Sequence, residues 1–356
     1  MEDFEIVDLA IDVLSNVTSL VNESLYSELG GELKILWSTK NYFYACASVG
    51  SEVDEPPKHY ITLSYETAVL LYRDIELYSK YIESGIDNGM FDKIFKDFNY
   101  PKTLFFHSDQ ELSCKQMFIS GVTWIFYHEL GHLIQEHGYI RKKHGCHVCT
   151  DIVDCASNDI ENHTVLSGRA SAVSHVTEMA ADYYATVSCL IALLMHFEGE
   201  ELEAETRSFT SALALVLYRF HGINPYERTE VPYGSHPQPL IRLEQTMPLI
   251  FEFYDKFDLA DEKSCNLNRA DLVNMTSWSS FTAGIFWLKK GNQKGIPEDF
   301  MISGSLQRPG MIEYHRVMVD IWDAINPEIE KVKRHSNPYA ELQFSDQYRK
   351  ILQNGG

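Results

Sequence analysis

The stretch His128-Glu129-Leu130-Gly131-His132 constrains this chain more than any other part of the sequence. Residues four apart lie on one face of a helix, so His128 and His132 can present both imidazole rings to one metal ion. Glu129 lies beside them, where its carboxylate can take a proton from a water molecule activated by the metal. Gly131 weakens a helix, which indicates that another segment packs closely there. The stretch predicts a central, buried helix that carries part of a metal site.

A third ligand for this metal is predicted further along the chain, since catalytic zinc is held by three protein ligands. Glu178 opens the run Glu-Met-Ala-Ala-Asp at 178–182 and can supply it. Asp182 lies one turn later, where it can hydrogen-bond the free ring nitrogen of a ligand histidine. The small residues on this helix would let it lie close to Gly131. The competing interpretation is that both acids are solvated residues at a helix start, favoured by the helix dipole.

Peptide hydrolysis passes through an oxyanion, which needs an electrophile opposite the metal. His236, in the segment Ser-His-Pro at 235–237, and Arg242 are the candidates for this role. Tyr183, Tyr184 and Tyr233 are weaker candidates, because an aromatic side chain near a buried helix more often belongs to the core. A histidine before a helix-initiating proline is also compatible with an ordinary loop.

Together these motifs resemble those of the gluzincin zinc peptidases. The resemblance is closest to the Ste24-like and heat-shock-type membrane metallopeptidases, although we expect no membrane helices in this chain. The chain also resembles the soluble Lit-type phage-exclusion peptidases in size and in its His-Glu-x-x-His motif. It covers residues 109–257. The resemblance implies zinc ligands at His128, His132 and Glu178, a general base at Glu129, a supporting carboxylate at Asp182, and His236 or Arg242 near the transition state.

A second group of metal-ligand residue types lies in the segment 139–174, which is predicted to be a long loop. A second, structural zinc ion needs four ligands, and the segment offers Cys146, Cys149, Cys155 and His163. The spacing matches no standard zinc finger. A redox-sensitive or merely flexible thiol loop is the alternative, as is a cysteine that covers the catalytic zinc until it is displaced.

Hydrophobic periodicity predicts an α+β protein that is mostly α. Helices are expected over most of the chain, and a small N-terminal sheet is expected to pack on the helix of the His-Glu-Leu-Gly-His stretch, as in a zincin-like core. Residues 1–260 are predicted to form the peptidase domain, and 261–356 a helical extension packed on the same core. One strand, His59–Ser64, is expected at a sheet edge, where an extended substrate could pair with it. The three predicted strands are Leu33–Trp37, Tyr42–Ser48 and His59–Ser64.

Composition limits the compartment and the partners. The 356 residues carry a formal net charge of -21, which disfavours binding to nucleic acid or to an anionic membrane. The acidic N-terminus does not resemble a signal peptide, and the longest apolar run, Val187 to Met195, is too short to span a bilayer. An odd number of cysteines, seven, is typical of a reducing compartment. We therefore expect a soluble, cytoplasmic protein.

The sequence thus predicts a zinc endopeptidase with one catalytic Zn²⁺ and a protein or peptide as substrate. An effector that stays silent until triggered, as in phage defence, would use the same chemistry. The alternative function is that of a peptidase-like regulatory or interaction protein, in which the metal serves stability or partner recognition. The intact Glu129 argues against that alternative, because a metal site without turnover has no need of a base.

Overall fold

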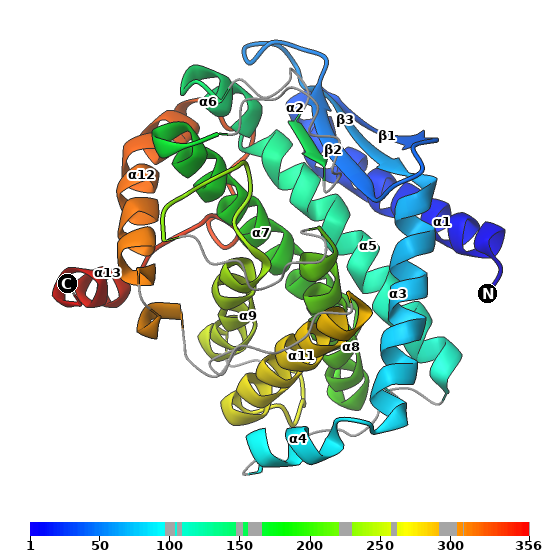
Figure 1. Ribbon diagram of the computed structural model, residues 1–356. Helices are drawn as coiled ribbons and strands as arrows, with labels where there is room; N and C mark the ends of the chain where they lie inside the picture. Colours follow the sequence, from blue (N-terminus) through cyan, green and yellow to red (C-terminus); the bar gives the residue numbers. More distant parts are fainter. Residues whose placement is uncertain are drawn as a thin grey trace.

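Long helices lie side by side at the centre of the molecule, with the sheet at one end (Figure 1). The computed structural model describes residues 1–96, 104, 109–146, 152–155, 166–220, 230–257, 262–291, 305–308 and 310–355. The predicted class, α+β and mostly α, is confirmed. The N-terminal elements are α1 (Asp3–Val21), the π-helical turn Asn22–Tyr26, α2 (Ser27–Leu29), α3 (Tyr65–Ser84) and α4 (Asn88–Ile94). The central and C-terminal helices are α5 (Gln110–Ile134), α6 (His137–Lys143), α7 (Gly168–His196), α8 (Gly199–Phe220), α9 (Pro239–Lys256), α11 (Arg269–Lys290), the 3-10 turn Ser305–Gln307, α12 (Met311–Val332) and α13 (Asp346–Asn354).

The sheet has the strand order β1-β3-β2-β4 within the described chain. Strand β1 (Glu32–Ser38) runs parallel to β3 (Lys58–Ser64), while β2 (Tyr44–Val49) is antiparallel to β3 and to β4 (Ile152–Cys155). The prediction that His59–Ser64 forms an edge strand is wrong. Its backbone is paired on both sides, so no added strand can reach it. The edges are β1 and β4, and β4 comes from the segment predicted as a loop.

Helix α5 carries the His-Glu-Leu-Gly-His stretch through the middle of the fold, beneath strands β2 and β3. It begins at an N-cap, Asp109, whose side chain accepts a hydrogen bond from the backbone N–H of Leu112 at 2.8 Å. It ends at Ile134. Glu136 then adopts a left-handed conformation with φ of 52°, and the chain turns directly into α6.

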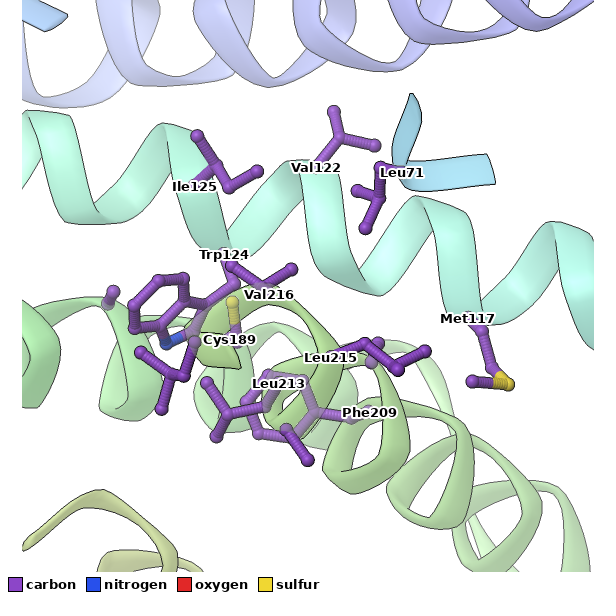
Figure 2. Close-up of a cluster of buried hydrophobic side chains, with 14 of the residues drawn as sticks. Leu71, Met117, Val122, Trp124, Ile125, Cys189, Phe209, Leu213, Leu215 and Val216 are labelled. Carbon is purple, nitrogen blue, oxygen red and sulfur yellow. The ribbon is translucent and has the colours of Figure 1, made fainter. Parts of the chain in front are cut away.

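The hydrophobic core surrounds α5. Figure 2 shows Trp124 and Met117 of α5 facing Leu213, Leu215 and Val216 of α8. The same buried cluster extends from Ile6 to residues beyond 260, such as Trp278 of α11 and Ala340. A hydrogen bond of 2.6 Å between the hydroxyl groups of Tyr78 and Thr282 also joins α3 to α11. Helix α11 thus packs on the same core as α5 and α8, whereas α12 forms a second buried cluster with the first turns of α7. The buried residues drawn in Figure 2 with labels are Leu71, Met117, Val122, Trp124, Ile125, Cys189, Phe209, Leu213, Leu215 and Val216.

Helix α7 packs between α5, α9 and α12 (Figure 1). It begins at Gly168, inside the segment 139–174 that was predicted to be a loop. Within the described residues, α7 is the one helix long and apolar enough to cross a membrane, and half of its most apolar 18-residue window is buried inside the protein. Since α7 also carries buried polar side chains, including Glu178 and Asp182, its apolar character is that of a core helix.

Candidate metal centre

Three side chains from two helices converge on one point. The Nε2 atoms of His128 and His132 on α5 lie 3.2 Å apart. Glu178 of α7 lies 3.3 Å from each ring, with Oε2 facing His128 Nε2 and Oε1 facing His132 Nε2. One donor atom from each residue falls within 4.8 Å of the others, and all three side chains are buried. This group could hold a metal ion.

The close approach of α5 and α7 makes this convergence possible. A Cβ atom on Gly131 would lie 3.1 Å from the Cβ of Tyr184 and 3.3 Å from the Cα of Ala181. Such distances are tighter than most packed carbon contacts. The prediction that another segment packs closely at Gly131 is confirmed. A side chain at position 131 would crowd the Tyr184 side chain and the backbone of Ala181, so glycine lets the two helices approach closely.

A second layer of contacts orients the ring of His128. Asp182 Oδ1 lies 2.9 Å from Nδ1 of His128. The guanidinium of Arg242, on α9, donates to both carboxylate oxygens of Asp182 at 2.8 and 2.6 Å. Trp124 stacks on the His128 ring with centroids 5.3 Å apart, and its indole N–H donates to Thr186 Oγ1. These contacts turn the Nε2 atom of His128 toward Glu178.

The ring of His132 has a different partner. Its Nδ1 atom lies 2.9 Å from Nδ1 of His137, the first residue of α6. The structure buries His137 against His132. A buried histidine is an uncommon outer partner for a metal ligand, since carboxylates and carbonyls usually take this place.

The ionisation states of the cluster suit a metal ligand set. Burial lowers the pKa of His132 to about 4, although Glu178 opposes the shift, so the ring is neutral at pH 7. Burial alone would raise the pKa of Glu178, but the charges of His236, His132 and Arg141 outweigh it and hold this pKa well below its ordinary value. A neutral imidazole and an ionised carboxylate are the forms that bind divalent metals. The residues present therefore fit a metal ion.

Arg141 of α6 contacts the cluster although no sequence motif indicated it. Its terminal nitrogen donates to Oε1 of Glu178. Its Nε donates to Thr177 Oγ1 at 2.7 Å, and its other contact is the Ser174 carbonyl at 3.3 Å. The partners of Arg141 lie more than thirty residues away in sequence, so spacing alone could not reveal the pair.

The two predicted electrophiles take different places. His236 Nε2 lies 3.7 Å from Glu178 Oε1, and its side chain is 18% exposed, at the edge of the cluster. Arg242 is buried on Asp182, and its nearest approach to Glu178 is 3.9 Å. Among the tyrosines, Tyr184 packs on Gly131, while the Tyr233 side chain is exposed. His236 thus lies at the edge of the cluster, whereas Arg242 lies behind Asp182.

The loop that presents His236 is fastened along α7. Ser171 Oγ donates to the Gly234 carbonyl, and Ser174 Oγ donates to the Ser235 carbonyl, both at 2.7 Å. His175 bridges from the Tyr233 carbonyl to the hydroxyl of Tyr314 on α12. The first turns of α7 thus bury polar side chains that bind this loop. They lack the apolar spacing from which a helix is predicted, so the sequence did not indicate them as helical. The sequence signal that could have found them is the Ser/Thr/His face at 171–177.

Glu129 is fully buried on α5. Helix α5 packs against strands β2 and β3 of the sheet.

The predicted second metal site falls mainly outside the described residues. Cys149 and His163 lie outside them, and for Cys155 only the backbone of β4 is described. Cys146 is buried at the end of α6, where its thiol lies 3.2 Å from the Ala170 carbonyl. A structural zinc ion at these four residues stays a prediction.

The chain matches no protein-family model, no curated protein and no solved structure.

Proposed function

We propose that this chain is a soluble, cytoplasmic zinc endopeptidase of the gluzincin type, acting on a protein or peptide substrate. The observation that carries the proposal is the buried cluster of His128, His132 and Glu178, with the carboxyl group of Glu129 on the same helix. Two imidazoles and one carboxylate are a ligand set of catalytic zinc sites. Glu129 would have no chemical use in a site that only held a metal.

The side chains of the chain would divide the reaction between them. Glu129 accepts a proton from the attacking water and delivers it to the leaving nitrogen. His236, at the exposed edge, donates a hydrogen bond to the carbonyl oxygen as negative charge develops on it. Asp182 and Arg242 keep the His128 ring in place. When bound, zinc would act as a Lewis acid toward the water and the scissile carbonyl.

The decisive test replaces the base and keeps the ligands. A Glu129→Gln protein should bind as much zinc as wild type but lose activity by a factor of about 100 or more, the usual contribution of a general base. Zinc content is measured on the purified proteins, and cleavage by terminal-peptide proteomics of cells that express each variant. An E129Q protein that cleaves at the wild-type rate would rule out this mechanism.

A buried glutamate elsewhere supplies the matched control. Glu205 lies on α8, and burial, with the nearby Glu201 charge, raises its pKa to about 7. Glutamine resembles the neutral form of this side chain, so Glu205→Gln should keep both zinc and activity. Loss of cleavage in E205Q as well would show that the assay reports general damage to the fold.

One observation favours a second function, that of a metal-binding regulatory or interaction protein. The side chains of His128, Glu129, His132 and Glu178 are each at most 1% exposed. Structural zinc sites are closed, whereas catalytic sites keep a position open to water and substrate. If wild-type protein is fully loaded with zinc and no cleaved protein is found in cells, this second function is the better account.

A further inference from the structure

We propose that Arg141 is a positioning residue of the metal centre, which fixes the carboxylate of Glu178 and thereby increases the affinity for a divalent cation. The inference rests on the metal site of the proposed function and extends it to a residue outside the ligand set. Its basis is the direct contact of the Arg141 guanidinium with Oε1 of Glu178. The same oxygen lies 3.3 Å from Nε2 of His132.

The guanidinium is itself held, so it can hold another group. Arg141 is largely buried, with a side-chain exposure of 12%. Its Nε is bound to Thr177 Oγ1, and Thr177 Oγ1 donates to the Val173 and Ser174 carbonyls of α7. A planar guanidinium fixed at two points presents its remaining N–H groups in one direction. The guanidinium of Arg141 is therefore fixed in position, and its hydrogen bond favours the one rotamer of Glu178 that reaches it.

Glu178 has other positive or polar neighbours to which it could turn. Nε2 of His236 lies 3.7 Å from Oε1, and the guanidinium of Arg242 lies 3.9 Å from Oε2. Without Arg141, the carboxylate would divide its time between these groups and the histidines. A carboxylate has about four acceptor positions on two oxygens, so the contact with Arg141 leaves acceptor positions for a metal.

The positive charge of Arg141 repels a divalent cation, which opposes the gain in affinity from a well-oriented Glu178. Arg141 is paired with the Glu178 charge, which reduces the field that a metal would meet. Outer partners of metal ligands generally contribute a factor of about 10 to 100 in affinity when they fix the ligand. We therefore expect orientation to outweigh repulsion here.

The fold places Arg141 through contacts with α12. Glu328 of α12 lies 2.8 Å from Nζ of Lys143, the last residue of α6, and 3.2 Å from Nε2 of His144, the residue after it. The other end of α6 begins at His137, against the ring of His132. Helix α6 is thus fixed at both ends, which sets the distance from Arg141 to Glu178.

The test measures metal binding directly. Arg141→Gln removes the charge and the fork of donors, while Lys142→Gln removes a charge from the exposed neighbouring residue. We expect R141Q to bind Zn²⁺ about 10- to 100-fold more weakly than wild type in a chelator competition, and K142Q to bind as wild type does. With Co²⁺ as the probe, the visible absorption spectrum of R141Q should shift, because a changed Glu178 contact alters the ligand field. A purely structural role would not move that spectrum.

Thermal unfolding in the presence of chelator checks that R141Q is folded. If it is not, Arg141→Lys takes its place: lysine keeps the charge but lacks the planar fork, so weaker Zn²⁺ binding is again expected. Wild-type affinity in R141Q, or in R141K where that variant is used, would overturn the role of Arg141 and leave the metal site standing. A wild-type protein that binds no Zn²⁺ would overturn both the metal site and this inference.

Discussion

At the scale of single residues, Asp182 has the most consequential contacts. Its carboxylate lies against Nδ1 of His128 on one side and accepts two hydrogen bonds from Arg242 on the other. Burial would raise the pKa of Asp182, but Arg242 and His128 outweigh it and lower this pKa, so the group is ionised. One carboxylate thus links a ring of the candidate metal centre to a cation on a third helix.

Replacing this carboxylate with an amide should affect metal binding and stability together. Asp182→Asn leaves Arg242 as a buried charge with a weaker partner, which costs about 3–5 kcal/mol when one member of a buried pair is removed. Zinc affinity should also fall about 10- to 100-fold, because the His128 ring loses its acceptor. Chelator competition and urea unfolding measure the two effects.

The control is a buried aspartate outside the candidate metal centre. Asp74 of α3 pairs with Lys290 and with Arg219, so Asp74→Asn should lose stability in a similar way. Its zinc affinity should stay that of wild type. Equal zinc affinities for D182N and wild type would contradict the positioning role of Asp182.

The site residues that could be predicted from the sequence are those with a recognisable spacing within one helix or within a known motif. His128 and His132 follow from helical spacing, and Glu178 and Asp182 share one helix face. Arg141 and His137 were not predicted as part of the centre, because their positions depend on how the chain turns at Glu136 into α6. A left-handed turn at a residue other than glycine or asparagine has no reliable sequence signal.

At the scale of elements, the contact between α5 and α7 sets the geometry of the centre. The two helices meet backbone to backbone at Gly131 and Ala181, within one turn of His132 and Glu178. A change in this spacing would move the carboxylate away from the histidines. The contact therefore couples packing to metal binding.

Gly131→Ala tests this coupling. An added methyl group would meet the Cα of Ala181 at 3.3 Å and the side chain of Tyr184 at 3.1 Å. Overpacking of this kind costs about 1–3 kcal/mol, while alanine gains about 1 kcal/mol of helix propensity. We expect a net loss of stability and weaker zinc binding, measured by urea unfolding and chelator competition.

Gly121 of the same helix provides the comparison. A methyl group there would meet the side-chain ends of Leu71 and Val216 at 3.1 and 3.3 Å, and these can move. Gly121→Ala gains the same helix propensity, so the difference between the two variants isolates the contact with α7. If G131A is as stable as G121A and binds zinc as well, the contact does not set the site.

Helices and strands were predicted where apolar residues recur at a regular spacing. They were missed where polar residues are buried. Strands β1 to β3 and helix α5 follow from such periods. The first turns of α7 carry Ser171, Ser174 and His175, which are buried because they bind the loop at 233–235. Strand β4 forms by pairing with β2, a partner about a hundred residues earlier, which a local pattern does not reveal.

At the scale of the whole molecule, the C-terminal segment is fastened to the end of α5. The backbone N–H of Arg334 donates to the Ile134 carbonyl at 2.8 Å, and its guanidinium binds Glu136. The same guanidinium donates to the carbonyls of Glu52 and Glu55 in the loop between β2 and β3. Residues after α12 thereby connect the sheet to α5, the helix of the candidate metal centre. We therefore expect the sheet and α5 to unfold together.

Buried neutral histidines in separate parts of this fold give a pH dependence of the whole molecule. Burial lowers the pKa of His59 on β3 and His175 on α7 to about 3, with Arg334 and His236 adding to the respective shifts, and burial lowers that of His315 on α12 to about 4. The ordinary value is 6.5. Between pH 6.5 and 4 the unfolded chain binds protons that the folded chain does not, so the free energy of unfolding falls as the pH falls.

Each such histidine contributes a slope of up to about 1.4 kcal/mol per pH unit in this window. Urea unfolding between pH 7 and 4.5, with chelator present to remove metal effects, should show this decline. His315→Gln removes one of these titrating groups. The slope of its free energy of unfolding against pH should therefore be smaller than that of wild type by up to about 1.4 kcal/mol per pH unit, whatever its stability at pH 7. The carboxylates of Glu178 and Asp182, with pKa values lowered in the folded state, add to the loss at still lower pH. A free energy of unfolding that does not change between pH 6.5 and 4.5 would mean that these rings are not buried as neutral groups.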